Sequence, residues 1–158
     1  MLARFKTVIK KLTQSEHADT VTQDELSIAA VLLLVEVMMA DHHIDEGEKQ
    51  QLLRSTMDLL ATNREESMEL INQAIRQHDE LVSLFDLTRV INLHFGQDRK
   101  IELLAHMWRI AYSDRQWDKY EEHLIRKVAD LLYISHKDFI HTRVQVQDQL
   151  SDEHDGKK

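Results

Sequence analysis

The stretch Ala40-Asp41-His42-His43-Ile44-Asp45-Glu46-Gly47-Glu48 decides the fold, because it lies between two helical patterns and recurs later in the chain. The second copy is Ser113-Asp114-Arg115-Gln116-Trp117-Asp118-Lys119-Tyr120-Glu121, and both copies read Asp-x-x-(aliphatic or aromatic)-Asp-x-x-Glu. We call residues 41–48 the first corner and residues 114–121 the second corner. The two copies are 73 residues apart, and flanking apolar positions keep that offset, as Leu34 and Met107 do. A repeated unit of helix, acidic corner and helix explains the pattern most simply.

The composition favours helices throughout the chain. The 158 residues include three glycines and no proline, so few residues interrupt a helix. No run alternates apolar and polar residues over several positions, as a half-buried strand would. The length is sufficient for one domain with a substantial core. We therefore predict an all-α fold, a compact bundle of seven or eight helices with an internal pseudo-twofold repeat at an offset of 73 residues.

Three segments are expected along the chain. Residues 1–16 have an amphipathic pattern and are predicted to form a helix packed on the domain. Contact of residues 2–15 with a membrane surface is the alternative, because basic side chains accompany the apolar face. Residues 22–148 form the predicted helical domain. Residues 149–158 are almost entirely polar and are expected to be a disordered tail.

The charge and the apolar runs exclude several classes of protein. The net charge is −8, which argues against a general nucleic-acid binder, because such proteins carry a basic surface. The longest apolar run, residues 28–40, contains Glu36 and is shorter than the roughly 20 residues of a membrane-spanning helix. There is no cysteine, so disulfides and thiolate chemistry are excluded. The N-terminus does not resemble a secretory signal, and we expect a cytoplasmic protein.

Part of each corner can be explained by helix capping. Asp45 and Asp118 stand where the N-cap of the following helix belongs, and Glu48 and Glu121 lie three residues later. Aspartate caps the free backbone N–H groups at a helix start, and a glutamate at the third helical position completes a capping box. On this interpretation the four residues are structural and need no further function.

Capping does not account for Asp41 and Asp114, the first acidic residue of each corner. Each stands at the C-terminal end of a helix, where the helix dipole disfavours negative charge by roughly 0.3–1 kcal/mol. A bound cation would neutralise them, and clustered carboxylates suit Ca²⁺ or Mg²⁺. Zn²⁺ is conceivable only at the first corner, where His42 and His43 join the carboxylates; a nearby arginine is the alternative neutraliser. The candidate metal ligands are Asp41, Asp45, Glu48, Asp114, Asp118 and Glu121.

No other motif indicates a site. The corners do not follow the EF-hand spacing, and there is no Gly-rich phosphate loop. No nucleophile or oxyanion site accompanies the histidines, so we predict no catalytic residues and no enzyme. We interpret His94, His106 and His123 as ordinary surface or core histidines rather than as metal ligands.

The first corner and the helix end before it, Val37-Met38-Met39-Ala40-Asp41-His42-His43-Ile44-Asp45-Glu46-Gly47-Glu48, resemble the tellurite-resistance TerB-like domain family. The N-terminal domain of a membrane-anchored DnaJ-like co-chaperone is similar. The resemblance covers roughly residues 25–146 and includes both corners. It implies a compact helical domain associated with tellurite and other stresses, in which the acidic residues of both corners are suspected metal ligands.

Two functional hypotheses follow. The first is a non-enzymatic TerB-like domain that binds a divalent cation in a tellurite or stress response. The second is a protein-interaction module whose corners only cap helices or contact a basic partner. The partner and the oligomeric state stay open.

Overall fold

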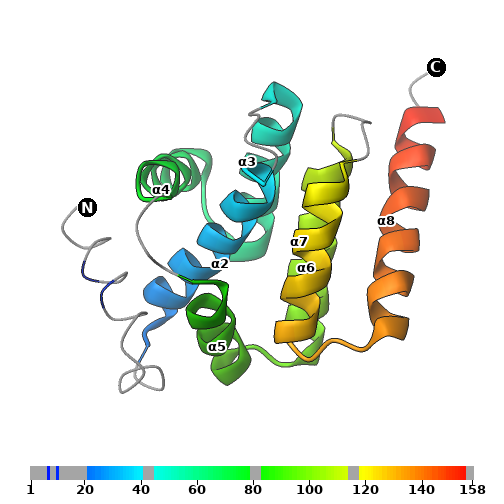
Figure 1. Cartoon of the computed structure of the whole chain (residues 1–158). Helices are drawn as coiled ribbons and strands as arrows, with labels where there is room; N and C mark the ends of the chain where they lie inside the picture. Colours follow the sequence, from blue (N-terminus) through cyan, green and yellow to red (C-terminus); the bar gives the residue numbers. More distant parts are fainter. Residues whose placement is uncertain are drawn as a thin grey trace.

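A computed structural model describes Thr7, Lys10 and residues 21–40, 45–78, 83–113 and 118–155. These residues form a compact all-α bundle (Figure 1), as predicted, and no strand is found among them. The predicted N-terminal helix falls almost wholly outside the described residues. The helices are α2 (Gln23–Met38), α3 (Glu46–Leu60), α4 (Arg64–Arg76), α5 (Leu84–His94), α6 (Gln97–Tyr112), α7 (Lys119–Leu131) and α8 (His136–Asp155).

Helix α2 is the centre of the bundle, because its sequence is apolar around the whole helix. Between Ile28 and Met38 every residue is buried except Glu36. Such a helix must be surrounded, and α2 contacts α3, α4, α5, α6 and α7. The Glu36 carboxylate is partly exposed and lies 2.9 Å from Nδ1 of His78. The buried side chains of α2 therefore form the centre of the core that these helices share.

Side-chain caps begin most of the helices, as the sequence predicts. The Thr22 hydroxyl accepts a hydrogen bond from the Glu25 N–H at 3.2 Å, and Asn63 accepts one from the Glu66 N–H at 2.8 Å. The start of α6 is an exception. Its N-cap is Gly96, which has no side chain to accept a bond, and Asp98 lies inside the first turn instead. A carboxylate there still interacts favourably with the positive end of the helix dipole.

Helix α8 stands at one edge of the bundle and packs on α6 (Figure 1). Trp108 of α6 is 1% exposed, and its ring lies 5.2 Å from that of Phe139 of α8. Arg143 of α8 donates a hydrogen bond to the Tyr112 hydroxyl at 2.7 Å. The helix continues to Asp155, so residues 149–155, expected to be disordered, form its last turns. The structure thus extends α8 beyond residue 148, the predicted end of the domain.

The order of the helices is consistent with the sequence repeat. Helices α2 and α3 flank the first corner, and α6 and α7 flank the second. Structural equivalence of the two halves in three dimensions stays a prediction. No helix among the described residues is both long and apolar enough to cross a membrane.

Candidate metal-binding sites

The two corners start their helices with the same cap. At the first corner, Oδ1 of Asp45 accepts hydrogen bonds from the N–H groups of Gly47 at 2.6 Å and Glu48 at 3.3 Å. At the second, Oδ1 of Asp118 accepts from Tyr120 at 2.7 Å and Glu121 at 3.2 Å. The predicted capping role of both aspartates is therefore confirmed. In each aspartate the cap uses only one of the two carboxylate oxygens.

The glutamates of the corners are buried. Glu48 and Glu121 are each 1% exposed, although glutamate is usually a surface residue. Each lies in the first turn of its helix, α3 or α7, where the backbone N–H groups and the helix dipole favour negative charge. By contrast, Glu66 occupies the same position in α4 and is exposed. Capping alone therefore does not require such a glutamate to be buried.

The start of α3 lies against the end of α6. A Cβ atom placed on Gly47 would be 3.6 Å from the carbonyl oxygen of Ser113. Ser113 is the C-cap of α6 and immediately precedes the second corner. The beginning of α3 is thus close to Ser113, the last described residue before the second corner. Asp41, His42 and His43, together with Asp114, lie outside the described residues, so their predicted roles as ligands stay predictions.

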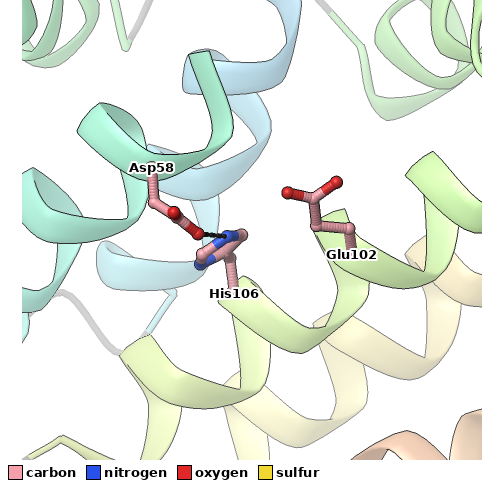
Figure 2. A group of neighbouring side chains, drawn as sticks. All are labelled: Asp58, Glu102 and His106. Carbon is pink, nitrogen blue, oxygen red and sulfur yellow. Dashed lines mark ion pairs between the residues drawn. The ribbon is translucent and has the colours of Figure 1, made fainter. Parts of the chain in front are cut away.

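A different cluster, formed by Asp58, Glu102 and His106, lies between α3 and α6. Each residue offers one ligand atom, and these three atoms lie within 4.8 Å of one another. Figure 2 shows Asp58 reaching from α3 toward the imidazole of His106, with Glu102 one turn away on α6. Nε2 of His106 lies 3.2 Å from Oδ2 of Asp58. Two carboxylates and an imidazole are suitable ligands for a divalent metal ion.

His106 is the buried member of the cluster, at 3% exposure. Its Nδ1 lies 3.0 Å from the Ser55 hydroxyl oxygen and accepts a hydrogen bond from Arg109 at 3.2 Å. Burial, and after it the positive charge of Arg109, together lower the pKa of His106 from 6.5 to about 4, although the Asp58 carboxylate opposes both effects. The ring is therefore neutral at pH 7.

Sequence reasoning missed this cluster, because its members are on two helices and follow no motif spacing. The interpretation of His106 as an ordinary core histidine took account of its own position only. The repeat contains a signal that would have singled it out. At an offset of 73 residues His106 corresponds to Leu33 and Glu102 to Ala29, so this helix carries polar residues where its counterpart has apolar ones.

Comparison with known proteins identifies the family. The profile of the family described as tellurite resistance protein TerB matches residues 27–144, which include both corners and the cluster. No curated relative and no solved structure matches the chain, so the similarity to a DnaJ-like co-chaperone is not shown. Because the match spans well over half of the sequence, this protein belongs to the TerB family, whose description names tellurite resistance.

Proposed function

We propose that this TerB domain is a cytoplasmic, non-enzymatic module that binds Ca²⁺ or Mg²⁺ at its acidic corners in a response to tellurite or related stress. The observation that carries the proposal is the burial of Glu48 and Glu121, each 1% exposed and each in the first turn of a helix that follows a corner. Burial holds each carboxylate at the start of its helix, and carboxylate oxygens are suitable ligands for Ca²⁺ or Mg²⁺.

The chemistry of the corners fits a hard cation. The candidate ligands of both corners are carboxylates, and Ca²⁺ and Mg²⁺ prefer oxygen ligands. Asp45 and Asp118 each use Oδ1 for the cap, which leaves Oδ2 available to a cation. The approach of Gly47 to the carbonyl of Ser113 adds a backbone oxygen close to the same region. These features support a site that either uses one corner or combines the two.

The second candidate function is a protein-interaction module, and the capping geometry favours it. Both aspartates have complete caps, so they have a structural role without any ion. Beside the second cap, Tyr120 presents a side chain that is 62% exposed. An exposed tyrosine next to an acidic corner suits a partner with an apolar and basic surface.

The two functions are separated by thermal melts of the whole chain with and without millimolar Ca²⁺ or Mg²⁺. A cation present at 100 times its dissociation constant should stabilise the protein by roughly 2.7 kcal/mol. We expect Glu48→Gln and Glu121→Gln to lose most of this increment, since each removes a buried charge with little change in shape.

The matched control is Glu66→Gln, which makes the same substitution at the same helix position of α4, where the residue is exposed. It should retain the full increment. Asp41→Asn tests the residue that capping does not explain and should also weaken binding. If the unmodified protein shows no shift with either cation, the cation proposal is wrong and the interaction module is the better explanation.

A further inference from the structure

A second polar site lies at the other end of α3 and has no part in the corners. Asp58 is in the last turn of α3, whereas Asp45 caps its first turn. At 1.5 Å per helical residue the two positions are roughly 20 Å apart along the helix. One cation therefore cannot contact both places, and the cluster of Asp58, Glu102 and His106 must be considered separately.

The imidazole of His106 supplies an observation independent of the two carboxylates. The residue is 3% exposed, and Nε2 faces Asp58 without the alignment of a regular hydrogen bond to any described atom. In Figure 2 the ring lies between the two carboxylates in this view, nearer to Asp58. A buried polar atom normally has a well-directed partner, and a metal ion among these three side chains would provide one.

The surroundings of His106 include the support that a metal-bound histidine needs. A coordinating imidazole usually donates its other N–H to an oxygen, which fixes the ring. Nδ1 lies 3.0 Å from the hydroxyl oxygen of Ser55, which is fully buried. With a metal on Nε2, the ring proton would stand on Nδ1 and be donated to Ser55. Arg109 would then give up its bond to Nδ1 and keep the one that it donates to Gln149 at 3.1 Å.

The sequence repeat has apolar residues at the positions that correspond to this cluster. The residues equivalent by the 73-residue offset are Leu131, Ala29 and Leu33, on α7 and α2, which also contact each other. Ala29 and Leu33 are fully buried. The pair of α2 and α7 thus has apolar residues at the positions where the pair of α3 and α6 has two carboxylates and an imidazole. A role beyond packing explains the difference.

We propose that Asp58, Glu102 and His106 form a binding site for a transition-metal dication of the Zn²⁺ type at the interface of α3 and α6. One nitrogen and two oxygen ligands suit Zn²⁺ better than Ca²⁺, which takes oxygen ligands. The side chains of Asp58 and Glu102 are 72% and 38% exposed, so an ion can enter from solvent. Three protein ligands leave a coordination position for water.

The test is a Zn²⁺ titration of the whole chain carrying Glu48→Gln, Glu121→Gln, His42→Gln and His43→Gln, which disables the corners by removing their buried carboxylates and their histidines. Affinity is measured by calorimetry, and the imidazole signals of His106 are followed by NMR after assignment by their loss in His106→Leu. We expect Zn²⁺ to shift these signals. Asp58→Asn and Glu102→Gln, which keep the side-chain shapes, should each weaken binding by about tenfold or more, since even residues that only support ligands cost that much.

The matched control is Asp98→Asn, which removes an exposed carboxylate one turn before Glu102 on the same helix. It should bind Zn²⁺ as the parent does. Unshifted His106 signals, or equal affinities of the parent, Asp58→Asn and Glu102→Gln, would show that the cluster is not a metal site. Because the corners are disabled throughout, neither result depends on the Ca²⁺ and Mg²⁺ proposal, which the melts test separately.

Discussion

Two helix contacts of this TerB domain correspond by the sequence repeat but differ in chemistry. Helix α3 packs on α6 with His106 and Asp58 between them, whereas α7 packs on α2 with Leu33 and Leu131 at the equivalent positions. Both contacts exist in the same bundle. The difference in chemistry predicts that the two interfaces respond differently to pH and to mutation.

The largest expected difference is in the dependence of stability on pH. The pKa of His106 falls from 6.5 in the unfolded chain to about 4 in the folded protein. Between these values the unfolded chain binds a proton that the folded protein does not, so the free energy of unfolding falls as the pH is lowered. Well above pH 6.5, protonation of His106 does not affect the free energy of unfolding. By pH 4 it has lowered that free energy by roughly 3 kcal/mol.

Denaturant unfolding at pH 7 and pH 4.5 measures this loss, and His106→Leu is the comparison. The leucine gives α6 the residue that α2 carries at the equivalent position, and it cannot be protonated. The carboxylates of the protein also titrate in acid, but they are common to both chains. The variant should therefore lose less stability than the parent between the two pH values. An identical loss in both would mean that His106 is not held neutral by its surroundings.

The sequence predicted the local features of the fold and missed the contact between helices. The caps at Asp45 and Asp118 follow from residues three positions apart, and this spacing is visible in the sequence. The contact of Asp58 with His106 depends on the packing of α3 on α6, which no local pattern specifies. Burial of Glu48 was also not predicted, because its capping role is the same whether the side chain is buried or exposed.

Mutation of the cap residue should destabilise the protein to the same extent at both corners, whereas the two helix interfaces should respond differently to mutation. Asp45→Ala and Asp118→Ala each remove an acceptor of two backbone N–H bonds and should each destabilise the protein by about 1 kcal/mol. Asp45→Asn and Asp118→Asn should cost little, because asparagine caps as well as aspartate does. Thermal melts in the presence of a chelator measure these effects without a bound cation. Unequal costs at the two corners would show that one aspartate has a structural role beyond the cap.

The smallest expected effect concerns Gly47, which corresponds to Tyr120 in the repeat. A Cβ on Gly47 would lie 2.9 Å from Oδ1 of Asp45, so the carboxylate must shift slightly. The second corner shows that a side chain is tolerated at this position, since Tyr120 carries one while its backbone N–H donates to Oδ1 of Asp118 at 2.7 Å. Alanine is also the better helix former, by up to about 1 kcal/mol in a helix interior. The two effects oppose each other, and Gly47→Ala should change the metal-free stability by only a few tenths of a kcal/mol.

The same substitution is informative when a cation is present. If Asp45 helps to bind Ca²⁺ or Mg²⁺, the displaced carboxylate should weaken binding although the metal-free stability hardly changes. Tyr120→Ala is the matched substitution at the second corner. Both tyrosine and alanine have a Cβ, so the Asp118 carboxylate should not move and the cation affinity should not change. Chemical denaturation in chelator and calorimetric titration together separate the two quantities. Equal cation affinities for Gly47→Ala and the parent would place the cation away from the Asp45 carboxylate.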